Sequence, residues 1–176
     1  MMSLYFIAVE PHSELIDKIR AIQKDFVERF SSSKSYRNFP HITIIPPFSL
    51  HEDEETALIS KFKNISLTIK HFKIYLNGFG SFPHSKNPAI FIKPENESEL
   101  TALFNEINSA MKSFDYKVSK FRPHLTVAYR DLSPENYRKS WMEYQTKTFR
   151  DRFEVNAVKL YKHDGRKWNE IASKIL

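Results

Sequence analysis

The spacing of apolar and polar residues predicts a strand and then an amphipathic helix at the start of the chain. Residues 4–9 are a continuous apolar run, which is typical of a buried strand. Beyond Pro11, apolar side chains from Leu15 to Phe30 recur at helical spacing, and this pattern predicts a helix of about four to five turns. A short serine-rich loop over 31–35 separates this helix from the next strand.

The same patterns predict further strands and helices in the remainder of the chain. The next expected elements are a strand from His41 that Pro46-Pro47 ends, a helix over 52–62, and strands over 72–76 and 89–92 joined by a hairpin-like loop at 77–88. The last ones are a helix from a capping box at Asn96 and Glu99 to about Phe114, a strand over 124–130, a helix starting at Ser133-Pro134-Glu135, and strands near 153–161 and 168–172 around a turn at Asp164-Gly165. This order of elements predicts an α+β protein.

A four-residue motif occurs twice. Pro40-His41-Ile42-Thr43 is followed 83 positions later by Pro123-His124-Leu125-Thr126. Because strand side chains alternate, each copy presents an imidazole and a hydroxyl on one face and buries the aliphatic residue between them. We therefore expect two lobes built on similar plans, each with one His-x-Thr strand. No linker or break in composition divides residues 1–176, so both lobes are expected in a single domain.

Composition excludes several classes of protein. Without Cys there is no disulfide framework, Cys–zinc site or thiol nucleophile, and three Gly residues are too few for a P-loop or a dinucleotide-binding fingerprint. The first ten residues lack the features of a signal peptide, and no apolar run approaches the ~18 residues of a membrane span, so we expect no membrane partner and a cytoplasmic location. A net charge of +6 fits a lysine-rich surface and an anionic ligand equally well.

Two histidines on opposite sides of a phosphodiester form an acid–base pair. A neutral imidazole takes a proton from an attacking water or hydroxyl, and a protonated one donates a proton to the leaving oxygen, each worth about 10²–10⁴-fold in rate. Both states are accessible near neutral pH because the ordinary pKa of histidine is about 6.5. The hydroxyls of Thr43 and Thr126 can donate to the phosphate oxygens where negative charge concentrates. This scheme requires no metal and no cofactor.

A metal site or a chance repeat would also produce paired histidines. A metal site normally needs a His-x-His pair or nearby carboxylates, whereas each His-x-Thr strand offers one good ligand. One His-x-Ser/Thr match is expected by chance among seven histidines, and both histidines could merely start strands after a proline. Two matches that share the preceding Pro and the intervening aliphatic residue favour a common chemical role.

The motifs resemble those of a known family. Phe39-Pro-His-Ile-Thr43 and Phe121-Arg-Pro-His-Leu-Thr-Val-Ala128 are similar to the paired motifs of the two-histidine (2H) phosphoesterases, and most of all to the RNA 2',3'-cyclic phosphodiesterase or 2'-5' RNA ligase-like branch. The segment Gly78-Phe-Gly-Ser-Phe-Pro83, followed by Pro88-Ala-Ile-Phe-Ile92, also resembles that branch. The resemblance extends from the first strand to at least Arg130.

The resemblance implies a fold and an activity. It implies a bilobal α+β fold in which pseudo-symmetric lobes, with antiparallel sheets and outer helices, surround a central cleft. It also implies metal-independent hydrolysis of a 2',3'-cyclic phosphate, at an RNA or nucleotide terminus, to a 2'-phosphate. His41 and His124 would be catalytic, and Thr43 and Thr126 would bind the phosphate. We take His41 as the acid and His124 as the base, although the pseudo-symmetry leaves this assignment open.

Four further residues are candidates for substrate binding. Arg122, two positions before His124, can contact a phosphate oxygen or simply be a solvated surface residue. Phe39 and Phe82 can stack on a base or belong to the core. Arg130 lies six positions after His124, farther along the same face.

The chain departs from the better-studied branch at Pro46-Pro47, where a Gly-containing turn is common, and this difference concerns the substrate more than the chemistry. Three activities remain open: a cyclic phosphodiesterase, a 2',5'-phosphodiesterase or RNA ligase-like enzyme, and a nucleotide- or RNA-binding module without turnover. With both motifs in one chain, a monomer is expected to suffice.

Overall fold

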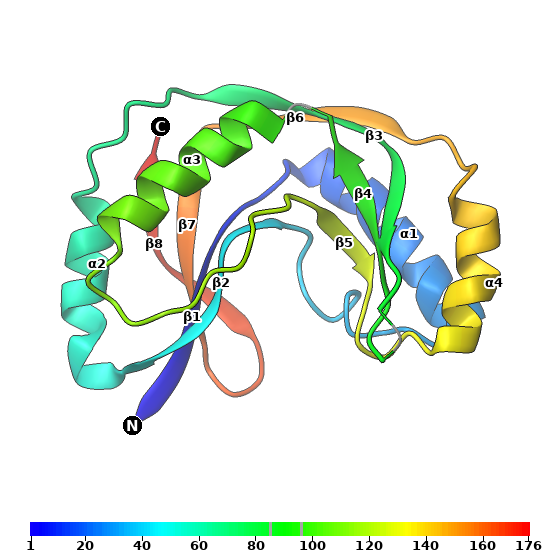
Figure 1. Cartoon of the computed structure of the whole chain (residues 1–176), viewed down its shortest axis with the longest axis horizontal. Coiled ribbons are helices and arrows are strands. Elements are labelled where there is room, and N and C mark those ends of the chain that lie inside the picture. The colour runs from blue at the N-terminus through cyan, green and yellow to red at the C-terminus, as the bar shows by residue number, and fades with distance from the viewer. Residues whose placement is uncertain (85, 96) are drawn as a thin grey trace.

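The computed structural model describes residues 1–84, 86–95 and 97–176, and over these residues eight strands form one curled sheet with four α-helices around it (Figure 1). The strands are β1 Met2–Val9, β2 Ile42–His51, β3 Phe72–Phe82, β4 Ala89–Pro94, β5 Leu125–Ala128, β6 Arg150–Val155, β7 Ala157–His163 and β8 Trp168–Ile175. The helices are α1 Ser13–Phe30, α2 Glu55–Lys63, α3 Glu97–Ala110 and α4 Pro134–Tyr144, and a 3₁₀ turn, η1 Glu52–Glu54, precedes α2. No helix within these ranges is long and apolar enough to cross a membrane.

The sheet has two halves that meet at the two motif strands. Its order is β6-β3-β4-β5-β2-β1-β7-β8, and every neighbouring pair is antiparallel. Between β2 and β5 a single register pair, Ile42 with Leu125, joins the halves. Each half contributes four strands, with its motif strand innermost. This arrangement matches the expected pseudo-symmetric α+β fold, with one continuous sheet in place of two separate ones.

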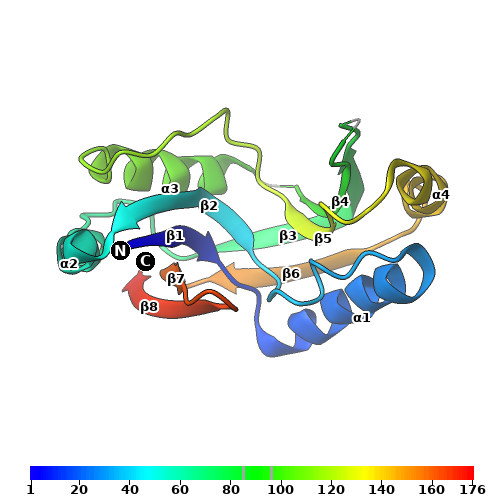
Figure 2. The same ribbon diagram turned by 90° about the horizontal axis from the view of Figure 1, so that it is seen from below.

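Two of the four helices, α1 and α3, cross from one half of the sheet to the other. Helix α1 follows β1 in the chain yet packs on β5, and α3 follows β4 yet packs on β2. Figure 2 shows α3 over β1 and β2 at one side of the molecule, while α1 and α4 lie at the opposite end beside β5. Each motif strand is therefore packed against a helix that follows a strand of the other half.

The prolines after the first motif do not end its strand as expected. Strand β2 continues through Pro46-Pro47 to His51. Tyr5 pairs with Phe48 and Ile7 with Ile45, so both prolines lie opposite Phe6 in a β-bulge. A bulge interrupts the ladder where proline cannot donate a hydrogen bond, which allows the strand to carry two prolines without stopping.

Two other strand predictions were wrong in extent. The first half of the expected hairpin-like loop at 77–88 is strand, because β3 runs on to Phe82 past a bulge at Gly78, whose φ is +64°. The segment 153–161, expected as one strand, is β6 and β7, separated at Asn156. Strand β6 pairs with β3 and β7 pairs with β1, so this short segment connects the two halves of the sheet.

The remaining differences concern the ends of elements. Helix α3 stops at Ala110 and not near Phe114, and β5 covers 125–128 and not 124–130. Asn96, the expected cap of α3, lies outside the described residues. The start of α4 is confirmed, since the Ser133 side chain accepts a hydrogen bond from the backbone N–H of Asn136 at 3.1 Å and Pro134 occupies the first helical position.

Candidate active site

The contact between β2 and β5 brings the two motifs together. Ile42 pairs with Leu125, and both are fully buried, as alternation predicted. Continuing this antiparallel register by one residue in each direction places His41 across from Thr126 and Thr43 across from His124. We call these four side chains the His–Thr quartet, and all of them line one pocket. The predicted convergence of the two motifs is therefore present.

Both imidazoles are held by the same local contact. The Nδ1 atom of His41 lies 2.7 Å from the carbonyl oxygen of Phe39, and Nδ1 of His124 lies 2.7 Å from that of Arg122. A carbonyl oxygen only accepts, so each Nδ1 carries the hydrogen and donates it. In the neutral ring this leaves Nε2 unprotonated and free to accept a proton, and in the charged ring Nε2 becomes a donor. One nitrogen of each ring is thus available for proton transfer.

Burial lowers the pKa of both histidines. Desolvation lowers the pKa of His41 to about 4, against the contrary effect of the Phe39 carbonyl, and a positive charge on His124 lowers it further. The pKa of His124 is also lowered by desolvation and raised in part by the Arg122 carbonyl. Both rings are therefore neutral at pH 7 in the free protein. A bound phosphate would favour the protonated form, because an opposite charge nearby raises the pKa.

Aromatic rings cause this desolvation. The ring centroids of Phe6 and Phe39 lie 5.1 and 4.9 Å from the centroid of His41. On the other side, the rings of Phe82 and Phe91 lie 5.0 and 5.3 Å from His124. Phe6 is on β1 and Phe91 is on β4, which are the strands next to β2 and β5 in the two halves. The two halves thus surround their histidines in equivalent ways.

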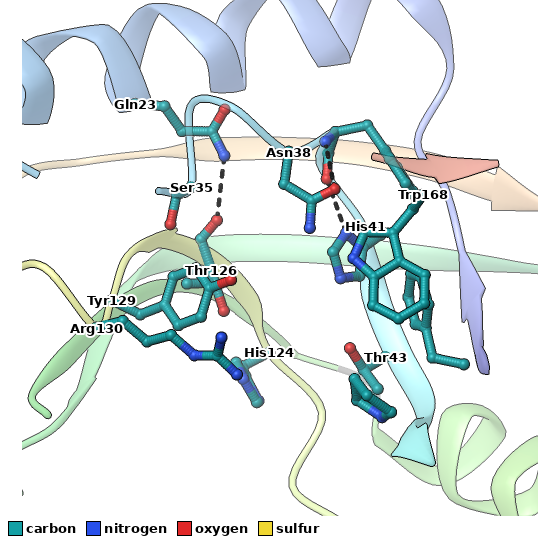
Figure 3. A pocket seen from close by; sticks show the side chains of 13 residues that line it. Gln23, Ser35, Asn38, His41, Thr43, His124, Thr126, Tyr129, Arg130 and Trp168 are labelled. Atoms are coloured by element: carbon teal, nitrogen blue, oxygen red, sulfur yellow. Dashed lines mark hydrogen bonds between the residues drawn. The ribbon is translucent and has the colours of Figure 1, made fainter. Parts of the chain in front are cut away.

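The pocket that contains the His–Thr quartet has a volume of about 220 Å³. Figure 3 shows His41, Thr43, His124 and Thr126 around it, with side chains from distant parts of the chain on its walls. Those walls also contain Phe6, Gln23, Ser35, Asn38, Phe39, Pro47, Tyr129, Arg130 and Trp168. Paired imidazoles and hydroxyls around one pocket place proton-transfer groups and hydrogen-bond donors together, as binding of an anionic group such as a phosphate requires.

A protein-family model matches almost the whole of this chain. The 2'-5' RNA ligase superfamily matches residues 8–167, a range that contains both motifs. The chain belongs to the 2'-5' RNA ligase superfamily. The family that the two motifs led us to expect is thus confirmed.

Relatives of this superfamily member carry phosphoesterase names. The RNA 2',3'-cyclic phosphodiesterase of Methanocaldococcus jannaschii is 26% identical over 162 residues, covering 89% of each chain. In fold, the chain is similar to E. coli LigT complexed with 3'-AMP (TM-score 0.71, 18% identity, 100% and 99% of the two chains). It is also similar to TT0787 of Thermus thermophilus (TM-score 0.70, 16% identity, 97% and 96%). These similarities confirm the expected fold and a hydrolase-type family.

The structure also places the four candidate substrate-binding residues beside the His–Thr quartet. Phe39 lines the pocket and packs on His41, so it is both part of an aromatic cluster and a wall of the site. Arg130 lines the same pocket, is exposed, and has a left-handed backbone with φ of +61°. Its guanidinium lies 5.3 Å from the ring of Tyr129. Figure 3 shows Tyr129 and Arg130 next to His124 and Thr126.

Arg122 and Phe82 line a second pocket of about 320 Å³. This pocket shares Thr43 and His124 with the first, so the two pockets meet at the His–Thr quartet. Arg122 is exposed, and β5 begins at Leu125, so the strand does not extend to Arg122. Its backbone carbonyl is the group that orients His124.

Several residues that line the pocket, among them Gln23 and Trp168, were not predicted from the sequence. Gln23 could have been found, because Leu15, Ile19, Phe26 and Phe30 define the buried face of α1 and Gln23 lies on that face. No local sequence pattern marked Trp168, at the start of β8, because its ring packs on that of Phe6, near the other end of the chain, with the ring centroids 4.5 Å apart.

Among the residues described, no group of three or more His, Cys, Asp or Glu side chains is placed to hold a metal ion.

Proposed function

We propose that this protein is a cyclic phosphodiesterase that opens a 2',3'-cyclic phosphate, at the end of an RNA or on a nucleotide, to a 2'-phosphate. The observation that supports it most is the orientation of the two imidazoles, each with Nδ1 held by a backbone carbonyl and Nε2 left for proton transfer. The name of the archaeal relative, an RNA 2',3'-cyclic phosphodiesterase, supports the same activity.

The proposed reaction is a single displacement at phosphorus. One neutral histidine accepts a proton from water at Nε2 while the water oxygen bonds to phosphorus. The P–O3' bond breaks, and the other histidine, protonated, gives its proton from Nε2 to O3'. The product carries a 3'-hydroxyl and a 2'-phosphate, and the two histidines have exchanged protonation states. The pair returns to its starting state by exchanging a proton with solvent.

The two threonines would stabilise the negative charge that develops on the non-bridging phosphate oxygens. Thr43 and Thr126 line the pocket with the histidines, and by register each lies across the sheet from one of them. Hydroxyl donors placed where negative charge forms stabilise a transition state more than a ground state. The His–Thr quartet thus supplies a base, an acid and two oxyanion donors, and the proposed mechanism needs no metal.

Hydrolysis of a short RNA with a terminal 2',3'-cyclic phosphate tests the proposal. The assay is run in excess EDTA, with the His41→Ala and His124→Ala variants alongside. Wild-type protein is expected to form the 2'-phosphate, and each variant is expected to lose about 10²–10⁴-fold in kcat. Circular dichroism and the Tm of each variant serve as controls for folding. A wild-type protein that binds nucleotides but never opens the ring would contradict the proposal.

A second candidate function is hydrolysis of a 2',5'-linked diester. The specific observation in its favour is the pocket of about 320 Å³ on the other side of the His–Thr quartet, lined by Phe82, Lys120 and Arg122 among others. A cyclic phosphate has no group on its leaving side except its own ribose, whereas a 2',5'-linked dinucleotide has a nucleoside on both sides. Comparing kcat/KM for the cyclic phosphate and the 2',5'-linked dinucleotide ranks the two substrates.

A further inference from the structure

Two buried polar atoms in the pocket wall have no hydrogen-bond partner among the residues that the structure describes. They are Oε1 of Gln23 and Oγ of Ser35, and these residues are only 2% and 3% exposed. Both residues line the pocket that holds the His–Thr quartet, and Figure 3 shows them on its wall above Thr126 and Tyr129. Buried polar groups are normally paired, because leaving one unpaired is costly. An unpaired acceptor and an unpaired hydroxyl in one pocket therefore point to a ligand.

The orientation of the Gln23 amide is determined by its surroundings. Its Nε2 atom lies 3.4 Å from the carbonyl oxygen of Thr126, which can only accept a hydrogen bond. The amide nitrogen must face that carbonyl, so Oε1 remains available and can only accept. Gln23 thus requires a hydrogen-bond donor on the ligand, while the Ser35 hydroxyl can either donate or accept.

Asn38 adds a donor to the same pocket. Its Oδ1 accepts a hydrogen bond from the backbone N–H of Phe39 at 2.9 Å, so its Nδ2 is the part left for a ligand. The loop that carries Ser35 and Asn38 is itself held in place, since Asp131 accepts hydrogen bonds from Ser32, Ser33 and Lys34. The polar wall is therefore pre-organised.

We propose that Gln23, Ser35 and Asn38 form a recognition site for the nucleoside attached to the phosphate, in which Gln23 accepts a hydrogen bond from a donor group of that nucleoside. This inference rests on the proposed function in taking a nucleotide as the ligand. The donor is an N–H of the base or, in a single nucleotide with a free 5' end, the 5'-hydroxyl of the ribose. In a 2',3'-cyclic phosphate the 2' and 3' oxygens are bonded to phosphorus and have no hydrogen to donate.

Binding measurements on two variants test this inference. Calorimetry is carried out with the four 3'-deoxynucleoside 2'-monophosphates, which like the cyclic phosphate have no 3'-hydroxyl, and with inorganic phosphate, on wild-type protein, Gln23→Met and Ser35→Ala. We expect each variant to bind the preferred nucleotide roughly three- to tenfold more weakly and to bind phosphate unchanged. Gln145→Met, at an exposed position after α4, is the matched control and should change neither affinity.

Thermal unfolding distinguishes a binding role from a structural one. Ser35 Oγ makes no hydrogen bond within residues 1–84, 86–95 and 97–176, so Ser35→Ala should leave the Tm of the free protein unchanged or raise it while nucleotide binding weakens. A lower Tm with unchanged nucleotide affinity would overturn the inference. So would equal losses for nucleotide and phosphate, or a wild type that binds no nucleotide more tightly than phosphate. If Gln23→Met does not fold, Ser35→Ala decides the outcome.

Two analogues identify the donor. Ribose 2-phosphate lacks the base, and the 5'-deoxynucleotide lacks the 5'-hydroxyl. The analogue that lacks the true donor should bind wild-type protein and Gln23→Met equally well, because the interaction is already gone. If both analogues still discriminate between wild type and variant, the inference is wrong.

Turnover separates this inference from the proposed function. Hydrolysis of the cyclic phosphate with an unchanged KM in both variants would overturn the inference and leave the function standing. Nucleotide binding that depends on Gln23 and Ser35, in a protein that does not hydrolyse the cyclic phosphate, would support the inference and contradict the proposed function.

Discussion

At the scale of single residues, the reactive nitrogen of each candidate histidine is selected by one backbone carbonyl. The group that holds Nδ1 belongs to Phe39 for His41 and to Arg122 for His124, in both cases two residues upstream. A proline lies between carbonyl and histidine in both motifs and restricts the backbone there. The repeated Pro-His therefore encodes the orientation of a ring as well as its identity.

The lowered pKa values predict the pH dependence of the reaction. The active form of the free protein has one neutral and one protonated histidine, and its amount peaks between the two pKa values. Since burial lowers both below the ordinary 6.5, kcat/KM should be greatest on the acid side of neutrality. It should fall about tenfold per pH unit well above the optimum, as the acid loses its proton. Initial rates from pH 4 to 9 test this, and an alkaline optimum would contradict it.

A sulfur leaving group identifies which histidine is the acid. A 2',3'-cyclic phosphate with sulfur at the 3' position expels a thiolate, which needs little protonation because the pKa of a thiol is only about 8.5. With His41 as the acid and His124 as the base, His41→Ala should regain most of its activity on this substrate, whereas His124→Ala should stay inactive. The opposite pattern would reverse the roles, and rescue of neither variant would argue against acid catalysis at O3'.

At the scale of elements, a glycine in β3 makes room for the aromatic wall behind His124. Gly80 pairs with Phe91 of β4, and a Cβ at position 80 would lie 2.5 Å from the Phe91 ring. That ring packs against both His124 and Phe82. The pairing of a glycine with an aromatic residue across two strands thus fixes the surroundings of a candidate catalytic side chain.

Gly80→Ala should displace the Phe91 ring and disturb His124. We expect kcat to fall about tenfold or more, since small misplacements of catalytic groups are costly. Gly78→Ala is the matched control in the same strand, because its φ of +64° strains any side chain, whereas the added Cβ would lie 3.8 Å from Lys93 Cε, an ordinary van der Waals contact. It should cost about 1–2 kcal/mol of stability and leave kcat nearly unchanged. Equal kcat for the two variants at a temperature where both are folded would refute the argument.

At the scale of the whole molecule, Asp131 ties the end of the second motif segment to the loop after α1. Its carboxylate accepts from Ser32 Oγ at 2.8 Å and from the backbone N–H groups of Ser33 and Lys34 at 2.8 and 3.0 Å. Burial opposes its ionisation, but these hydrogen bonds outweigh burial and lower the pKa of Asp131. The contact spans almost a hundred residues of sequence and holds the pocket wall in position.

Asp131→Ala should reduce the free energy of unfolding by roughly 1.5–3 kcal/mol near neutral pH. Because the pKa of Asp131 is lower in the folded protein, its stabilisation is complete above the unfolded value of about 3.9 and disappears as the pH falls through the folded value. The difference between wild type and variant should therefore shrink in strong acid. Urea unfolding at pH 7 and near pH 3 measures both, with Asp131→Asn expected to lose less. A difference that is independent of pH would exclude the charge as the cause.

Elements and chemistry that depend on neighbouring residues were predictable from the sequence. The helical spacing from Leu15 to Phe30, the cap at Ser133 and the alternation in both motifs are all local patterns, and the structure bears them out. Strand ends were less predictable, because a partner strand can accommodate Pro46-Pro47 or Gly78 in a bulge that the local sequence alone would interpret as a stop.

By itself, the sequence determined which side chains share a face of each motif strand, because that follows from the two-residue period of an extended chain. Only the tertiary structure decided that β2 pairs with β5, and so that His41 lies across from Thr126. It alone also brought Gln23 from α1 and Trp168 from β8 to the same pocket. The physical reason is that such contacts come from burial of apolar surface between distant segments, which no local period records.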